Sequence, residues 1–176
     1  MKRLVLMIVP ALICGVAVFT SCNSKAETDE VNWTNKIEEL FEHNKNKISL
    51  SEGIWGTLLQ GEGCGNMHIP GEGSSCKLFP VKREIVIYEY ATFNESIQST
   101  QLSGAHFEKI HTKLVATTIC DKEGFFEVEL KPGRYSVFVK DFGALRAAGG
   151  VDGYGGLSPV LVEPLKVSEM NLRVYK

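Results

Sequence analysis

Two short stretches in the second half of the chain alternate apolar and polar side chains with a period of two. Their apolar positions are Phe126, Val128 and Leu130 in the first stretch, and Tyr135, Val137 and Val139 in the second. This period is typical of β-strands that bury one face and leave the other in water. Five further stretches also predict strands: residues 53–60, 82–90, 114–120, 158–163 and 170–175. The sequence therefore predicts an all-β fold from residue 50 onward.

Two turn signals connect the strands in residues 117–140. In the first, Asp121 can accept backbone N–H bonds with its carboxylate and Gly124 tolerates a positive φ, which together predict a hairpin turn. In the second, Pro132 fixes φ and Gly133 can supply the left-handed residue of a type II turn. We therefore expect three consecutive strands joined by two tight reversals.

These turn and core residues carry a family resemblance. The pattern is Asp121-x-x-Gly124-x-Phe126 followed by Leu130-x-Pro132-Gly133-x-Tyr135. It resembles the hairpin of carboxypeptidase regulatory-like domains, which are transthyretin-like (prealbumin-like) sandwiches found in many bacterial envelope lipoproteins. The resemblance implies a transthyretin-like antiparallel β-sandwich of about seven strands over residues 50–176. It also implies that the domain has no catalytic residues of its own, so no active site is carried over.

The first 21 residues have the three regions of a secretory signal. Lys2 and Arg3 precede an apolar run of sixteen residues, which is short of the roughly twenty that span a bilayer. The small residues before Cys22 resemble a bacterial lipobox, in which the cysteine thiol takes the diacylglycerol, although Phe19 stands where leucine is typical. We expect cleavage before Cys22 and lipidation there. Cleavage that leaves a free N-terminal cysteine is the alternative.

Residues 22–31 are polar and acidic without a periodic pattern, which predicts a disordered tether. Asn23, rather than Asp, stands at the second position of the processed chain. By resemblance to enterobacterial lipoproteins, this favours transport to the outer membrane. We therefore expect a protein of the bacterial cell envelope that is held at the membrane through Cys22.

Residues 32–48 predict one amphipathic helix. Apolar and amide side chains recur at intervals of three and four residues, with lysines and glutamates on the opposite face. We expect the apolar stripe to pack on the sandwich. A partner helix or the membrane surface is the alternative, although the mixed charge of the polar face does not suit an anionic lipid surface.

The charge balance argues against nucleic acid as a partner. Loss of residues 1–21 would leave 17 Lys and Arg against 21 Asp and Glu. The sequence contains no basic cluster of the kind that phosphate backbones require. The remaining 155 residues suit one domain.

A Gly-rich loop at residues 61–80 contains two cysteines. In an oxidising compartment, Cys64 and Cys76 most simply form a disulfide, and this thirteen-residue ring would add about 3 kcal/mol to the stability. The same loop holds Met67 and His68, soft ligands that suit copper or zinc together with Cys64. A periplasmic metal-binding protein is therefore the alternative function, although a disulfide would consume both thiolates.

The insertion at residues 91–113 holds His106 and His111. Both could join a metal site, but surface histidines without a further role are the commoner outcome. Cys120, at the end of a predicted strand, is expected to be buried and inert. The alternative is a nucleophile assisted by one of these histidines, but no orienting partner stands at a recognisable spacing. We therefore expect no enzymatic activity and no cofactor.

A second Gly-rich loop at residues 141–157 offers candidate contact residues. Its GGVDGYGG portion lacks the strand-to-helix setting of a phosphate-binding loop, so we expect no nucleotide. Arg146, Asp152 and Tyr154 are the polar and aromatic residues that could contact a protein or a glycan partner. A simple connection between strands is the alternative. The sequence thus predicts a non-catalytic envelope lipoprotein that binds or positions a partner through its loops.

Overall fold

The computed structural model describes residues 31–64 and 76–176. All the elements below belong to the unit Asn32–Lys176. The predicted signal sequence, the predicted lipidation site Cys22 and the candidate metal ligands Met67 and His68 lie outside the described residues.

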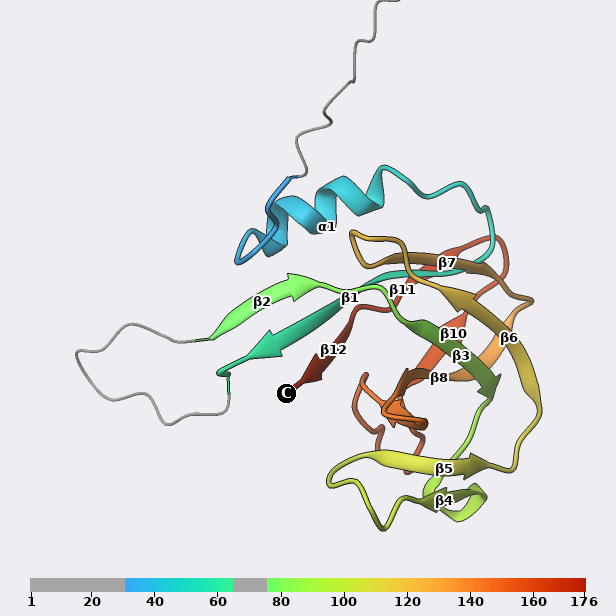
Figure 1. Cartoon of the computed structure of the whole chain (residues 1–176). Helices are drawn as coiled ribbons and strands as arrows, with labels where there is room; N and C mark the ends of the chain where they lie inside the picture. The colour runs from blue at the N-terminus through green and yellow to red at the C-terminus, as the bar shows by residue number, and fades with distance from the viewer. Residues whose placement is uncertain (1–30, 65–75) are drawn as a thin grey trace, which may run out of the picture. The chain divides into compact units, whose positions relative to one another are not determined.

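The smaller sheet is built around one long strand, β1 (Gly53–Glu62) (Figure 1). Along one edge it pairs in parallel with β11 (Val167–Glu169) and then β12 (Leu172–Tyr175). It also pairs antiparallel with β7 (Phe125–Glu129) over its first half and with β2 (Lys77–Pro80) over its second half. β1 is therefore the centre of this sheet.

The larger sheet is antiparallel throughout and has the order β4-β5-β9-β8-β3-β6, with β10 beside β8. A short 3₁₀ helix, Phe93–Glu95, precedes β4. The strands are β3 (Glu84–Glu89), β4 (Ser96–Gln98), β5 (His106–Ile110), β6 (Leu114–Ile119), β8 (Gly133–Asp141), β9 (Ala144–Ala147) and β10 (Pro159–Val162).

Side chains from both sheets meet in one main hydrophobic core. Ile54 and Leu58 of β1 pack with Ile85 and Ile87 of β3 and with Phe126 of β7, all at most 2% exposed. Because successive residues of a strand point to opposite faces, β8 also presents residues to a second cluster on its other side. This second cluster consists of Ala91, Phe107, Ile110, Phe138, Ala147 and Leu157.

The predicted all-β sandwich is confirmed, but its strands are more numerous and partly parallel. The described residues form twelve strands instead of about seven. Four of the additional ones are short pieces within the regions 61–80, 91–113 and 141–157, where the sequence predicted loops or an insertion, and the fifth is β11, between the last two predicted strands. Their lengths of three to five residues are too short to show a period in the sequence.

The two reversals in residues 117–140 carry the chain between the sheets. The Asp121–Gly124 turn is present, since Gly124 N donates to Asp121 O (3.1 Å) and Gly124 has a φ of 70°. However, β6 pairs with β3 in the large sheet, whereas β7 pairs with β1 in the small one and β8 returns to the large one. The predicted hairpin pairing is therefore wrong. The type II turn is wrong too, because Gly133 has no positive φ and is the first residue of β8.

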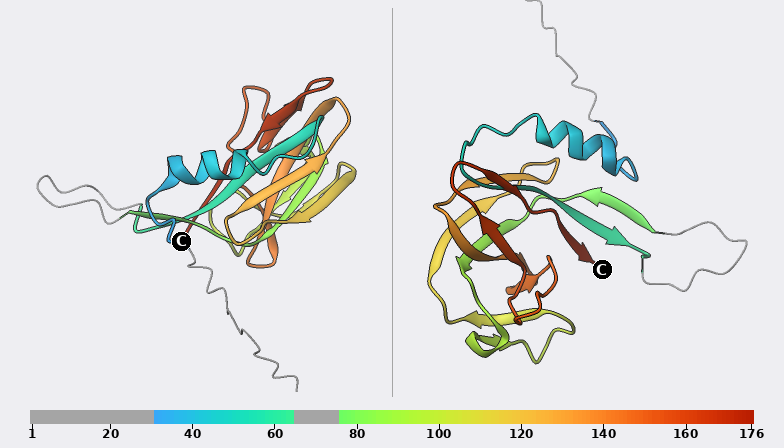
Figure 2. Two further views of the ribbon diagram at one scale, coloured as in Figure 1. Left: turned by 90° about the horizontal axis from the view of Figure 1, so that it is seen from above. Right: turned by 180° about the vertical axis from the view of Figure 1, so that it is seen from behind.

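The helix α1 (Ile37–Lys45) is shorter than the predicted range 32–48 but packs as expected, alongside β1 and β2 (Figures 1 and 2). Leu40 and Asn44 are fully buried. The side-chain amide of Asn44 donates to Thr57 Oγ1 and to Glu123 O, both at 2.9 Å. No helix in the described residues is long and apolar enough to cross a membrane.

Gly124→Ala should destabilise the fold more than Gly104→Ala. Both glycines have a positive φ, which costs an L-residue about 1–2 kcal/mol. A Cβ on Gly124 would lie 2.4 Å from Leu58 O, whereas one on Gly104 would meet nothing within 4 Å. Because this overpacking adds about 1–3 kcal/mol, urea unfolding should separate the two variants by that amount. Equal losses would contradict the packing of the Asp121–Gly124 turn on β1.

Candidate functional site

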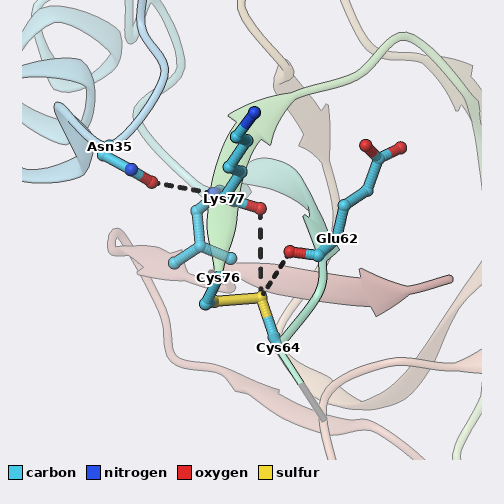
Figure 3. The surroundings of a disulfide bond; sticks show 6 residues. Asn35, Glu62, Cys64, Cys76 and Lys77 are labelled. Atoms are coloured by element: carbon cyan, nitrogen blue, oxygen red, sulfur yellow. Dashed lines mark hydrogen bonds between the residues drawn. A yellow bond between two sulfur atoms is a disulfide. The ribbon is translucent and has the colours of Figure 1, made fainter. Parts of the chain in front are cut away.

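Cys64 and Cys76 form the predicted disulfide, with their Cα atoms 4.2 Å apart (Figure 3). The bond lies just beyond Glu62 and Lys77, the last residue pair between β1 and β2. Cys64 Sγ is 3.5 Å from the carbonyl oxygen of Glu62 and 3.9 Å from that of Lys77. The disulfide therefore fastens the ends of these two strands, and neither cysteine has a thiolate to offer a metal ion.

The candidate residues of the second Gly-rich loop separate into two places. Asp152 and Tyr154 lie together on the surface, where the loop meets residues that the sequence did not single out. Arg146 belongs to β9 and lies elsewhere, where it donates to Asp141 Oδ2 (3.3 Å) and to Tyr175 O (2.9 Å). The structure thus keeps two of the three predicted contact residues together.

The Asp152 carboxylate organises its loop by accepting hydrogen bonds from four donors. Two are backbone N–H groups, from Tyr154 (2.9 Å) and Gly156 (2.8 Å). The others are side chains, Arg134 Nη2 (2.8 Å) and the Tyr90 hydroxyl (3.0 Å). Desolvation alone would raise the pKa of Asp152, but these donors outweigh it and hold that pKa below its ordinary value. Desolvation and the adjacent carboxylate raise the pKa of Tyr90, so its phenol keeps the proton that it donates.

Two tyrosines and one arginine form an exposed surface around Asp152. The Arg134 guanidinium carbon lies 4.4 Å from the ring centroid of Tyr90 and 5.9 Å from that of Tyr154. Tyr154 is 82% exposed. We call Tyr90, Arg134, Asp152 and Tyr154 the tyrosine–arginine surface. Sequence reasoning missed Tyr90 and Arg134 because they come from the end of β3 and the start of β8, and no spacing relates those positions to residue 152.

Arg134 also lines an open groove of about 490 Å³. The other residues of the groove come from β3, β6, β8 and the segment that follows β7, and they include Glu89, Leu114, Leu130 and Tyr135. The groove therefore mixes apolar and charged side chains. Arg134 connects it to the tyrosine–arginine surface.

Two of the three loop regions meet in the described structure. Leu157 N donates to Ala91 O (2.8 Å), and Thr92 forms a bridge with Gly156. β5 of the insertion also pairs with β9 of the second Gly-rich loop. The insertion thus supports the loop that carries Asp152 and Tyr154.

A buried charged cluster surrounds Asp141, which is 2% exposed, at the end of β8. Its carboxylate contacts the guanidinium groups of Arg83 and Arg146, and Arg83 Nη2 also donates to Gln60 Oε1 (2.8 Å). His106 Nε2 lies 3.8 Å from Asp141 Oδ2. A carboxylate with two guanidinium groups is paired well enough to be buried, so the cluster fastens strand ends together.

The predicted surface histidines differ from each other. His111 is exposed, but His106 is only 7% exposed, so the prediction is wrong for His106. Its Nδ1 lies 2.8 Å from Ser103 O and must donate there, while Nε2 has no hydrogen-bond partner. As the first residue of β5, His106 is buried beside Asp141, which a lone histidine in a polar insertion did not reveal.

Cys120 is buried and free, as predicted. Desolvation raises the pKa of this thiol to about 12. At neutral pH the thiol is therefore protonated, which opposes the reading of Cys120 as a nucleophile. Among the described residues, no group of three or more His, Cys, Asp and Glu side chains could hold a metal ion.

No family model, curated protein or solved structure matches the chain. The resemblance of residues 121–135 to carboxypeptidase regulatory-like domains therefore stays a prediction.

Asp141→Asn should cost about 3–5 kcal/mol of stability, because it leaves two largely buried guanidinium groups, 22% and 17% exposed, without their counter-charge. The matched control is Glu84→Gln. Glu84 pairs with Lys140 at the surface (3.0 Å), and such pairs contribute about 0–1 kcal/mol. Denaturant unfolding of both variants measures the difference. Similar losses would show that the Asp141 cluster is not a buried ion-pair network.

Cys120 should make the fold less stable at alkaline pH. The unfolded thiol ionises near 9.0, whereas the folded thiol ionises near 12, so its contribution is complete below pH 9 and is lost as pH rises toward 12. The unfolding free energy of the native chain minus that of Cys120→Ala should stay constant to about pH 8.5. It should then fall by about 1.4 kcal/mol per pH unit. A flat difference up to pH 10.5 would contradict the burial of the thiol.

Proposed function

We propose that the protein is a non-catalytic lipoprotein of the bacterial cell envelope that binds a protein or glycan partner through the tyrosine–arginine surface. The observation that carries this proposal is Tyr154. It is 82% exposed, yet it stands on a loop that Asp152 fixes with two backbone hydrogen bonds. An exposed tyrosine ring that is already held in place beside a guanidinium group offers a partner both apolar area and hydrogen-bond donors.

The chemistry of this surface suits a partner with both apolar and polar groups. Tyrosine and arginine are the residue types that concentrate binding energy in interfaces, because they bury a large area and still donate hydrogen bonds. The Asp152 contacts already hold Arg134 and the loop before any partner arrives. Little side-chain freedom is therefore lost on binding, which favours affinity.

Three of the described groups that could act in catalysis are engaged or protonated. The Asp152 carboxylate already accepts four hydrogen bonds. The Cys120 thiol is protonated at neutral pH, and His106 is buried beside Asp141. These observations support a binding role rather than a catalytic one. The metal-binding alternative loses support, because Cys64 and Cys76 are joined to each other.

Attachment to the membrane through Cys22 belongs to this proposal and rests on the signal-like residues 1–21 and the lipobox-like residues before Cys22. Asn23 supports the outer membrane as the destination. The resemblance to carboxypeptidase regulatory-like domains also supports the proposal, because those domains occur in envelope lipoproteins and have no catalytic residues of their own.

Tyr154→Ala should abolish recovery of the partner from intact envelopes. A tagged full chain is cross-linked in whole cells and purified, and the co-purified proteins and glycans are identified and quantified. Truncation of a central aromatic contact costs about 2 kcal/mol or more, so recovery should drop at least about tenfold.

The matched control is Phe142→Ala, which removes an aromatic ring that is 67% exposed but lies outside the tyrosine–arginine surface. This variant should recover the partner as well as the native chain does. The proposal fails if the native chain recovers no protein or glycan above background, or if Tyr154→Ala recovers the same amount.

A further inference from the structure

β6 is the longest uncovered strand edge in the described part of the chain. It pairs with β3 on one side, and no other described strand pairs with it. In Figure 1 it runs along the margin of the large sheet, and the rear view in Figure 2 agrees. Its six residues, LVATTI, include no charge and no proline, although natural proteins normally protect edges with one or the other.

Other strand edges in the described residues are shorter or covered. β4 has three residues. Ser49 binds the Glu127 side chain beside β7, and Ser168 Oγ donates to Leu161 O on β10. β6 has no comparable cover, so its edge is the exception.

The backbone groups that face outward can be assigned from the pairing with β3. Cys120 N donates to Arg83 O (3.0 Å), and Ile119 lies opposite Glu84. Because only alternate residues of an antiparallel strand point toward a given neighbour, Thr118 and Cys120 face β3. The backbone groups of Thr117 and Ile119 therefore point to the open edge, and the Ile119 side chain is 63% exposed.

We propose that β6 pairs with β6 of a second copy of this chain, antiparallel and around a two-fold axis. When Thr117 of one copy lies opposite Ile119 of the other, each copy supplies two N–H and two C=O groups, and all of them are paired. Thr118 of each copy then lies opposite its own counterpart, close to the axis. Pairs of β-branched residues across antiparallel strands favour such contacts.

The charges at the ends of β6 select the antiparallel arrangement. Lys113, which is exposed, directly precedes the strand. Asp121 follows it, with a side chain that is 40% exposed although it pairs with Lys47 of the same copy (2.7 Å). Antiparallel pairing brings Lys113 of each copy to the acidic end of the other, whereas parallel pairing would bring like charges together. The same edge is thus complementary to itself in hydrogen bonding and in the order of its end charges.

The test uses cysteine cross-linking of the full chain in intact cells. In the proposed pair the Thr118 Cα atoms form a non-hydrogen-bonded pair about 4.5 Å apart, which lies within the range for a disulfide. Thr118→Cys should therefore give a band of twice the chain mass on a non-reducing gel after mild oxidation. Gln98→Cys, at the exposed edge of β4 in the same sheet, should not, and neither should the native chain.

A second substitution distinguishes specific pairing of the two β6 strands from cross-links formed by random collision of the proteins. Adding Thr117→Lys or Ile119→Lys to Thr118→Cys should lower the dimer band about tenfold, because the lysines of the two copies then lie diagonally across the axis and repel each other. Adding Leu161→Lys, at an exposed residue of β10, should leave the band unchanged. Circular dichroism checks that each variant is folded.

Three outcomes would overturn the proposal. The first is the absence of a dimer band with Thr118→Cys in folded protein. The second is a dimer band that the two lysine substitutions do not reduce. The third is an adduct with a different protein in place of the dimer, which would make β6 the acceptor of a foreign strand.

Discussion

The burial of β1 on both faces is the constraint on which the rest of the structure depends. One face of β1 supplies Ile54 and Leu58 to the core, and Thr57 on the other face receives the amide of Asn44 from α1. A strand covered on both sides can hold polar groups only if they are hydrogen-bonded. Thr57 meets this requirement through Asn44, and Gln60 meets it through Arg83. Since every other strand of the small sheet pairs with β1, the position of β1 fixes that sheet.

The large sheet is attached to β1 through the turn at Asp121–Gly124. Leu58 N donates to Gly124 O (2.8 Å), so the chain crosses between the sheets while bonded to the central strand of the small one. Beyond this crossing, the second cluster packs the insertion onto the outer face of β8, where Phe107 and Phe138 meet edge to face. The loop that carries Tyr154 is bonded to Ala91 and therefore rests on packed structure.

Sequence patterns predicted what depends on local periodicity and missed what depends on pairing. The alternation around Phe126 and Val137 identified two strands. The position of Cys64 and Cys76 at the two ends of a Gly-rich loop, with an oxidising compartment expected from residues 1–21, predicted the disulfide. Strands of a hairpin and strands that lie in different sheets show the same alternation. The pattern therefore did not reveal that β7 lies in the small sheet, whereas β6 and β8 lie in the large one. Short strands such as β5 carry too few residues to show a period, which is why His106 was expected at the surface. Arg146 was grouped with Asp152 because they are close in sequence. In the structure Arg146 lies in β9 and contacts Asp141 and Tyr175, whereas Asp152 lies in the following turn and contacts Arg134.

A comparison of two aspartates explains why we propose one part of the molecule as the binding surface. Both are paired with arginine, but Asp141 is enclosed by two guanidinium groups and its charge is consumed inside the fold. Asp152, on the second Gly-rich loop, pairs with Arg134, and the Arg134 side chain remains 49% exposed. The first arrangement contributes stability and leaves little for a ligand to contact. The hydrogen bonds of Asp152 fix the loop, while the Arg134 guanidinium group and the Tyr154 ring remain exposed to water. Because order is established before binding, contacts to that ring and that cation need not offset the cost of fixing the loop.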